Sequence, residues 1–248
     1  MAALDNLSRP SDSKPPPSTE DDDSFTQKQF KFVILGDGAV GKTSICHRFV
    51  EDHFANSYKQ TIGLDFFVKR FTMPNPKGGK VQIALQLWDI GGQSVSSKMI
   101  TKYIHGANAV LLVYDITNYQ TFENVIDWLS IVKQNIENKE DMPYTALVGN
   151  KYDLQHLRTV KVSRHKELCD KQKLESCYVS AKTGDGLHTM FYHICAAVAG
   201  FKISKTELES EMKVMSAAII GHQQNDPNQK TFKERLADEK KKNECVLL

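Results

Sequence analysis

Residues 32–43 read FVILGDGAVGKT, an apolar run followed by a glycine-rich turn and a Lys-Thr pair. The run has the composition of a buried strand, and the turn fits the pattern G-x-x-x-x-G-K-[ST] that opens a helix. In such a turn, backbone N–H groups curl around phosphates and the helix N-terminus adds partial positive charge. Lys42 would reach the β- and γ-phosphates, and the Thr43 hydroxyl would bind Mg²⁺. The stretch therefore predicts a phosphate loop after a strand.

The phosphate loop alone does not distinguish ATP from GTP, and a glycine-rich turn without any ligand is the alternative. Asn150-Lys-Tyr-Asp153 follows the strand-like run TALVG. The Asp153 carboxylate can accept hydrogen bonds from N1–H and the exocyclic amine of guanine, whereas adenine lacks that paired edge. Ser180-Ala-Lys182 follows the next strand-like run and fits a second base contact. Guanine is therefore expected, and a polar turn that closes a strand is the alternative.

Apolar strand-like runs alternate with stretches of helical spacing from Lys31 onward. This alternation predicts an α/β fold with a largely parallel sheet and helices on both faces. Residues 64–73 and 81–87 are the exception, because the Pro-Gly-rich segment 74–79 between them predicts a hairpin. One antiparallel edge strand is therefore expected. The last regular element is expected to be a helix over residues 187–199.

Composition divides the chain into three regions. Residues 1–28 are rich in Pro, Ser and acidic side chains, which predicts a disordered arm. Residues 29–202 carry the folded domain, and residues 203–248 form a polar, flexible tail.

The overall charge of the chain is close to neutral, with 32 basic against 30 acidic side chains and a net charge of +2. No global field favours nucleic acid as a partner. Five widely spaced cysteines favour a reducing compartment, here the cytoplasm. No apolar run predicts a spanning segment or a signal peptide, so membrane contact would need an anchor.

The last four residues, Cys245-Val-Leu-Leu, fit the C-a-a-X pattern, and the terminal Leu favours geranylgeranylation of Cys245. A chance match is the alternative. Three lysines at 240–242 would add attraction to an anionic leaflet. A single lipid chain predicts reversible binding to a cytoplasmic membrane face, with a prenyltransferase and a prenyl-binding chaperone as partners.

Together these motifs resemble the small GTPases of the Ras superfamily over about residues 31–200. The expected segments occur in order: the phosphate loop, Thr61, Asp89-x-x-Gly92-Gln93, and the two base motifs. Four further stretches are similar to Rab signatures, and the combination is closest to the divergent Rab branch numbered twenty-eight: TIGLDFF (61–67), LQLWDIGGQ (85–93), KYIHGA (102–107) and LLVYDIT (111–117).

This resemblance implies a P-loop GTPase domain with a six-stranded, mostly parallel sheet. It also implies a GTP/GDP switch that uses Mg²⁺, and partners that include an exchange factor, a GTPase-activating protein and effectors. Intracellular or plasma membranes, with a cilium among the candidates, would be the place of action in vesicle traffic.

The resemblance also assigns roles to single residues. Thr61 would close over the γ-phosphate and bind Mg²⁺ together with Thr43, and Asp89 would hold Mg²⁺ through water. Gln93 would orient the attacking water, with Lys42 stabilising charge. The positions expected to bind nucleotide are Gly38, Ala39, Val40, Gly41, Lys42, Thr43, Ser44, Phe54, Tyr58, Thr61, Gly92, Asn150, Lys151, Asp153, Ser180, Ala181 and Lys182. Phe66, Trp88 and Tyr103 would present the switches to effectors, and burial in the core is the alternative for these three aromatics.

The segment WDIGGQS (88–94) departs from most Rabs, since Ile90, Gly91 and Ser94 stand where Thr, Ala and Glu are usual. Gly91 beside Gly92 adds backbone freedom, which predicts a mobile switch and slow intrinsic turnover. Three hypotheses follow: a hydrolysing switch, a GTP-held interaction module with negligible hydrolysis, and a P-loop kinase or ATPase. Asp153 argues against the third.

Overall fold

The computed structural model describes residues 26–55, 57–75, 78–92, 97–134, 136 and 142–201. Strands and helices alternate along the chain, as the sequence predicts. In chain order, the elements are β1 (Thr26–Leu35), α1 (Lys42–Glu51), β2 (Leu64–Pro74), β3 (Lys80–Ile90), α2 (Ser97–Ile104), β4 (Ala109–Asp115), α3 (Tyr119–Glu123), α4 (Val125–Gln134), β5 (Tyr144–Asn150), the 3-10 helix η2 (Tyr152–Leu157), α5 (Val162–Gln172), β6 (Glu175–Tyr178) and α6 (Leu187–Ala199).

The six strands form one sheet in the order β2-β3-β1-β4-β5-β6. Every neighbouring pair is parallel except β2 and β3, which form an antiparallel hairpin that closes at the pair Pro74 and Lys80. The predicted mixed sheet with one antiparallel edge strand is therefore confirmed, and so is the helix over residues 187–199.

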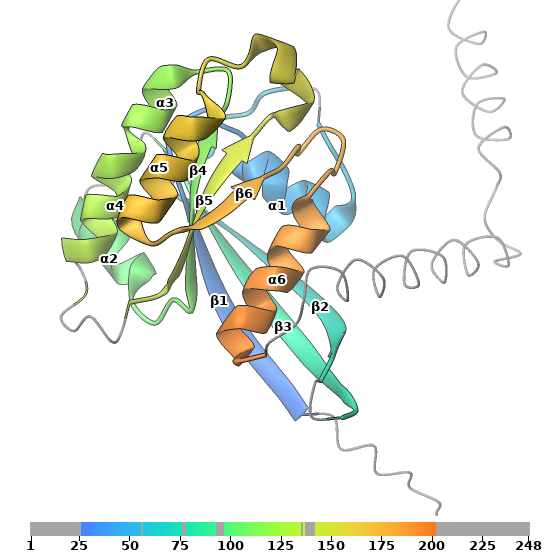
Figure 1. Ribbon diagram of the computed structural model, residues 1–248. Helices are drawn as coiled ribbons and strands as arrows, with labels where there is room; N and C mark the ends of the chain where they lie inside the picture. Colours follow the sequence, from blue (N-terminus) through green and yellow to red (C-terminus); the bar gives the residue numbers. More distant parts are fainter. Residues whose placement is uncertain are drawn as a thin grey trace, which may run out of the picture.

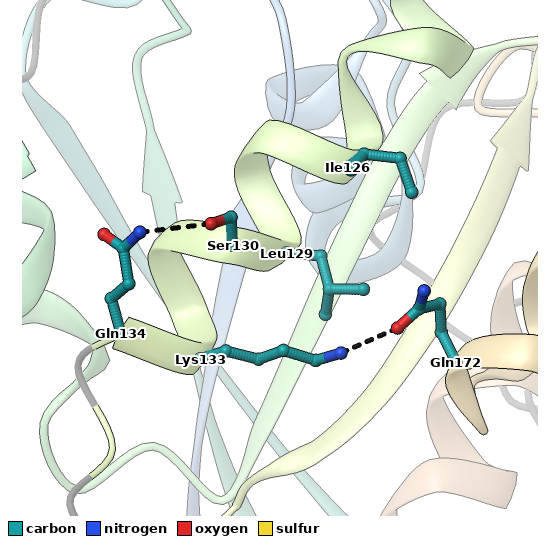
Figure 2. Close-up of a pocket in the computed structure, with 6 residues that line it drawn as sticks. All are labelled: Ile126, Leu129, Ser130, Lys133, Gln134 and Gln172. Atoms are coloured by element: carbon teal, nitrogen blue, oxygen red, sulfur yellow. Dashed lines mark hydrogen bonds between the residues drawn. The ribbon is translucent and has the colours of Figure 1, made fainter.

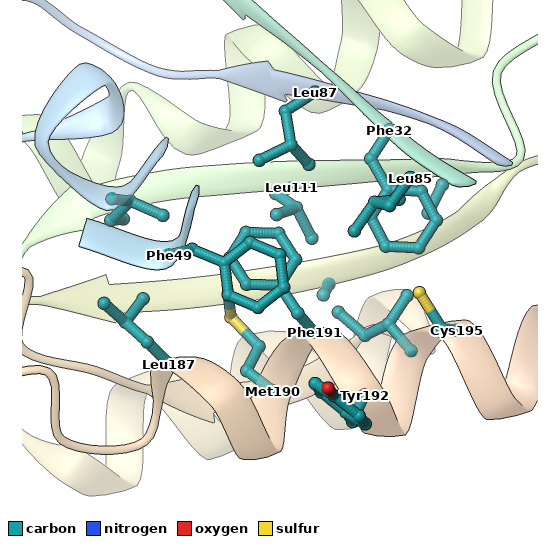
Figure 3. Packing of buried hydrophobic residues seen from close by; sticks show 14 of the residues in the cluster. Phe32, Phe49, Leu85, Leu87, Leu111, Leu187, Met190, Phe191, Tyr192 and Cys195 are labelled. Atoms are coloured by element: carbon teal, nitrogen blue, oxygen red, sulfur yellow. The ribbon is translucent and has the colours of Figure 1, made fainter. Parts of the chain in front are cut away.

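Helices cover both faces of the sheet, with α1 and α6 on one side and α2, α3, α4 and α5 on the other (Figure 1). On the first side, Phe49 of α1 stacks on Phe191 of α6 with ring centroids 4.1 Å apart, beside Phe32 of β1 (Figure 3). Strand β4 is buried along its whole length, because both of its faces are covered by helices. The core thus lies on both sides of the central strands.

Strand β1 begins at Thr26, five residues before the predicted start and inside the segment 1–28 that composition assigns to an arm. Its polar first residues pair in parallel with β3, beginning with Thr26 opposite Val81. The Lys28 ammonium donates to the Ala199 carbonyl oxygen at 3.2 Å and lies 5.2 Å from the centre of the Phe201 ring. Partners from β3 and the end of α6, rather than apolar residues of its own, therefore hold this part of the strand.

Because β1, β4, β5 and β6 are parallel and β3 is parallel to β1, the loops after these strands gather at one edge of the sheet. The predicted nucleotide motifs follow one of these strands, except Phe54, Tyr58 and Thr61, which lie in the segment between α1 and β2. None of the helices in the described part of the chain is long and apolar enough to span a bilayer.

Candidate functional site

The loop between β1 and α1 packs so closely on its neighbours that two of its positions require glycine. A Cβ atom on Gly36 would lie 2.2 Å from the Val113 carbonyl oxygen of β4, and one on Gly41 would lie 2.4 Å from Nδ2 of Asn150. Both glycines also have positive φ angles, +141° and +96°. The loop is therefore seated between the central strand and the predicted base motif.

Lys42 is buried at the start of α1, and its ammonium donates to the carbonyl oxygens of Gly36 and Asp37, each at 2.8 Å. Burial lowers the pKa of Lys42, and the carboxylates of Asp89 and Asp37 oppose that shift. The ammonium group is therefore held inside the loop by two of its carbonyl oxygens.

Thr43, Thr61 and Asp89, the three predicted magnesium ligands, converge beside the loop. The hydroxyl oxygens of Thr43 and Thr61 lie 2.6 Å apart, and the Thr43 hydroxyl donates to Oδ2 of Asp89. Asp89 is fully buried, and its Oδ1 has no hydrogen-bond partner among the described residues. Burial raises the pKa of this carboxyl, against the effects of the Thr43 hydrogen bond and Lys42.

A divalent cation fits this set of oxygen atoms. Mg²⁺ prefers hard oxygen ligands and is commonly held by one carboxylate, hydroxyl groups and substrate phosphates. It would give the buried Oδ1 of Asp89 the partner that it lacks. Elsewhere in the described residues, no three His, Cys, Asp or Glu side chains gather in a group that could hold a metal ion.

Gly91 and Gly92 at the end of β3 are placed by close packing. A Cβ atom on Gly91 would lie 2.5 Å from the Thr61 carbonyl oxygen, and the Gly91 N–H donates to the Gly63 carbonyl oxygen at 2.9 Å. A Cβ atom on Gly92 would lie 2.4 Å from the Gly38 nitrogen. The unusual glycine at 91 thus lets the Thr61 segment lie directly against β3, a reason that the sequence did not suggest. Gln93 lies outside the described residues, as do Ser94 and Cys245.

Ile90, another departure from most Rabs in this segment, is the last residue of β3 and is buried in the core on the side of the sheet that α2, α3, α4 and α5 cover. Its side chain contributes to the core on the α2 side. The substitution of an aliphatic residue for a threonine here is therefore explained by packing.

Asn150 joins the phosphate loop to the second base motif. Its Nδ2 donates to the Val40 carbonyl oxygen at 2.8 Å, and its Oδ1 accepts from the Ala181 N–H at 3.1 Å. The Ser180 hydroxyl donates to Oδ1 of Asp153 at 2.6 Å. Three motifs that are far apart in the sequence are therefore brought into direct contact, and the third motif holds the Asp153 carboxylate of the second through Ser180.

Lys151 adopts a left-handed conformation with a φ angle of 65°, and its ammonium lies 2.6 Å from Oδ2 of Asp115 at the end of β4. The other oxygen of Asp115 accepts from the backbone and the hydroxyl of Thr117. The sequence prediction missed Asp115, although a carboxylate at the end of an apolar strand is a signal that could have found it. This ion pair fixes the side chain that the resemblance lays along the guanine.

A column of aromatic and basic side chains packs behind the base motif. Tyr178 of β6 lies against Gly149, where a Cβ atom would come within 2.7 Å of its ring. Tyr178 also stacks on His165, at 4.5 Å between ring centroids, and the Arg158 guanidinium lies 4.8 Å above it. The backbone just before Asn150 is therefore held from the side opposite the phosphate loop.

The remaining predicted contacts lie around this centre. Val40 is buried, whereas Ala39 and Lys182 are exposed, and Gly38 and Ser44 are half-buried in and after the phosphate loop. Phe54 is half-buried and packs against the core beside α1 and α6, and Tyr58 is 67% exposed. Their predicted contacts with the nucleotide remain predictions.

Phe66 of β2, Trp88 of β3 and Tyr103 of α2 form a connected group, in which Trp88 and Tyr103 are half-buried and pack against the core. The Phe66 and Trp88 rings are 5.6 Å apart edge to face, and the Trp88 and Tyr103 rings are 6.1 Å apart. Phe66 is 51% exposed, so burial in the core does not explain it. Lys31 covers the Trp88 ring at 4.1 Å from its centroid.

A shallow hollow between α4 and α5 lies apart from the motifs (Figure 2). Ser130 accepts a hydrogen bond from Gln134 across one helical turn, and Lys133 donates to Gln172 of α5 at 2.6 Å. Aliphatic stems and amides line it, without any acidic or nucleophilic pair, so its chemistry does not compete with that of the loop site.

Comparison with known proteins places this geometry in a family. Residues 31–200 match the Ras family. The chain is 45% identical over 199 residues to the Ras-related protein Rab-28 of Caenorhabditis elegans, covering 80% of this chain and 79% of that protein. It is 36% identical to the Ras-related protein RGP2 of Oryza sativa subsp. japonica (77% and 84% covered) and 34% identical to the Ras-related protein Rab-10 of Caenorhabditis elegans (73% and 86% covered). The chain therefore belongs to the Ras family as a Rab-type small GTPase, an enzyme that hydrolyses GTP and a switch in vesicle traffic.

Proposed function

We propose that this GTPase switches between GDP and GTP at the site formed by the phosphate loop, the base motifs and the oxygen cluster. The observation that carries the proposal is the convergence of Thr43, Thr61 and Asp89, because it joins the start of α1 to the Thr61 segment before β2 and to the end of β3. Lys42 and the loop amides would bind the phosphates, and Asp153 would select guanine.

When bound, Mg²⁺ would neutralise charge on the phosphates, and Thr43, Thr61 and Asp89 would hold it. Thr61 also lies against Gly91, so ordering of the Thr61 segment and of the 90s loop would be linked. Effectors would recognise the two segments together when a γ-phosphate orders them, through a surface that includes Phe66 and Trp88.

The proposal also concerns the rate of GTP hydrolysis. Water would attack the γ-phosphorus in line, with Gln93 orienting it, and Gly38 leaves room beside the phosphate for an arginine supplied by an activating protein. We propose slow intrinsic turnover that such a partner raises by about 10³ to 10⁵. The alternative is a GTP-held interaction module with negligible hydrolysis.

Single-turnover GTP hydrolysis by the full chain, compared with Gln93→Leu, separates these two functions. A slow wild-type rate that falls further in the variant supports the hydrolysing switch. Equal, negligible rates in both proteins, with tight GTP binding retained, would support the interaction module.

Association with a cytoplasmic membrane face is the second part of the proposal. The C-terminal Cys245 would carry a geranylgeranyl group added by a prenyltransferase, and a prenyl-binding chaperone would keep a fraction soluble. Cys245→Ser should move the protein to the soluble fraction of cells, and equal membrane binding of both proteins would contradict the anchor. The resemblance to the Rab-28 branch favours a ciliary membrane, which imaging of a fluorescently tagged chain in ciliated cells would test.

A further inference from the structure

Asp37, the second residue of the phosphate loop, is held by two side chains from a distant part of the chain. Its Oδ2 accepts from Nδ2 of Asn124 at 2.6 Å, and its Oδ1 accepts from Nε1 of Trp128 at 2.8 Å. The two donors lie 87 and 91 residues further along the chain, just after α3 and in α4. Both carboxylate oxygens thus point toward α3 and α4.

The direction of this carboxylate matters because Lys42 is close by. The Lys42 ammonium donates to the Asp37 carbonyl oxygen at 2.8 Å, and the Asp37 charge opposes the lowering of the Lys42 pKa by burial. A carboxylate free to turn toward Lys42 would compete with a phosphate for the same ammonium and would repel the phosphate itself. Hydrogen bonds from an amide and an indole satisfy the charge on the side away from the site.

We propose that Asn124 and Trp128 are positioning residues of the phosphate loop. They hold the Asp37 carboxylate against α3 and α4, which leaves Lys42 and the loop amides available to the β-phosphate of the nucleotide. This inference rests on the proposed nucleotide binding and deepens it, because it names groups outside every sequence motif that set the affinity of the loop for phosphate.

Trp128→Phe and Asn124→Ala test the proposal in the full chain. Phenylalanine keeps most of the aromatic packing and removes only the indole donor. Equilibrium affinities for GDP and GMP are measured by displacement of a fluorescent GDP analogue, because GMP lacks the β-phosphate that Lys42 would contact. Each variant should bind GDP about tenfold more weakly and GMP less than about twofold more weakly, which corresponds to loss of one charge-assisted hydrogen bond.

A charge-removal variant tests the cause of the loss. If the released carboxylate competes for Lys42, the double variant Asp37→Asn/Trp128→Phe should recover most of the GDP-to-GMP affinity ratio that Trp128→Phe loses. A double variant as weak as the single one would overturn the claim that the charge must be held away from Lys42.

Asn118→Ala is the matched control on the same segment. Asn118 caps α3 by accepting the Gln120 N–H at 3.1 Å and does not touch Asp37, so its loss should lower the melting temperature and leave the affinity ratio unchanged. If the GDP-to-GMP affinity ratios of Trp128→Phe and Asn124→Ala equal that of Asn118→Ala, the positioning role is overturned. Failure of the wild-type chain to bind either nucleotide would instead contradict the proposed function.

Discussion

Residue 91 is glycine, and its lack of a Cβ atom allows the Thr61 segment to lie close to the end of β3. In Gly91→Ala the new Cβ atom would lie 2.5 Å from the Thr61 carbonyl oxygen, so the Thr61 backbone must move. Overpacking of this kind costs about 1–3 kcal/mol, or roughly 5- to 150-fold in affinity for a state that needs the closed segment. We expect the affinity for a non-hydrolysable GTP analogue to fall by a factor in that range, with little change for GDP.

Gly106→Ala is the matched control for this change. Among the described residues, a Cβ atom on Gly106 would meet no atom within 4 Å, so alanine there costs only the local backbone strain of its positive φ angle, +71°. Its GTP-analogue and GDP affinities should equal those of the wild type. Equal loss of both nucleotides in Gly91→Ala would show that residue 91 does not act through Thr61.

His165 makes the stability of the folded chain depend on pH. It is buried between the Tyr114 hydroxyl, at 2.9 Å from Nδ1, and the Ser176 hydroxyl, at 2.8 Å from Nε2, and burial beside Arg158 lowers its pKa to about 4. Between pH 6.5 and 4 the unfolded chain binds a proton there that the folded chain does not, so stability falls as pH falls through this window. At pH 5 the loss should be about 2 kcal/mol relative to pH 7, measured by chemical denaturation.

His165→Gln provides the comparison, because glutamine can hydrogen-bond both hydroxyls but does not titrate. This variant should show a smaller decrease in stability between pH 7 and pH 5 than the wild type. Identical pH profiles in the two proteins would mean that His165 is not the group that takes up the proton.

At the scale of elements, the sequence predicted what depends on local pattern. The hairpin, the helix over residues 187–199 and the alternation of strands and helices follow from periodicity and from Gly and Pro punctuation. The early start of β1 at Thr26 was missed, because its first residues are polar and are held only by pairing with β3 and contacts with α6. Pairing partners decide such strand ends, and single-sequence patterns do not contain them.

The same distinction applies to the site. The phosphate loop and the base motifs are contiguous segments and could be recognised as such, whereas the ion pair of Lys151 with Asp115 and the tether of Asp37 join residues that only the fold brings together. Gly91 was interpreted as a source of freedom, but the fold uses it for close packing. An isolated sequence does not distinguish these two uses of glycine.

The first residues of β1 provide an element-scale prediction. A chain that begins at Phe30 loses the pairs that start with Thr26 opposite Val81, together with the Lys28 contacts with Ala199 and Phe201. We expect it to fold with a melting temperature several degrees lower than a chain that begins at Thr26, measured by calorimetry. Nucleotide affinity should be unchanged, because the site lies at the other end of the strand. Equal melting temperatures would mean that these residues contribute nothing to stability.

At the scale of the whole molecule, the proposed nucleotide site lies at the edge of the sheet where the carboxyl ends of the parallel strands come together. The carboxyl ends of β1, β3, β4 and β5, with the segments that follow them, contribute groups that contact one another, such as Asn150 with the Val40 carbonyl oxygen and Thr43 with Asp89. A ligand bound there would contact segments from most of the sequence. Its binding should therefore stabilise the domain as a unit rather than one loop.

Ligand and metal removal test this coupling through the buried carboxylate. GDP with Mg²⁺ at about 1,000 times its dissociation constant should add about 4 kcal/mol, which raises the melting temperature by about 8–16 °C, and excess EDTA should reverse much of the gain. Oδ1 of Asp89 is buried without a hydrogen-bond partner in the part of the chain that the structure describes, so Asp89→Asn should leave the ligand-free form equally stable or more stable. The same variant should lose most of the difference between Mg²⁺ and EDTA, because the amide no longer offers a charge to the cation. If Asp89→Asn retains the full difference in stability between Mg²⁺ and EDTA, the metal binds away from Asp89. If Asp89→Asn destabilises only the ligand-free form, the carboxylate is a structural group instead.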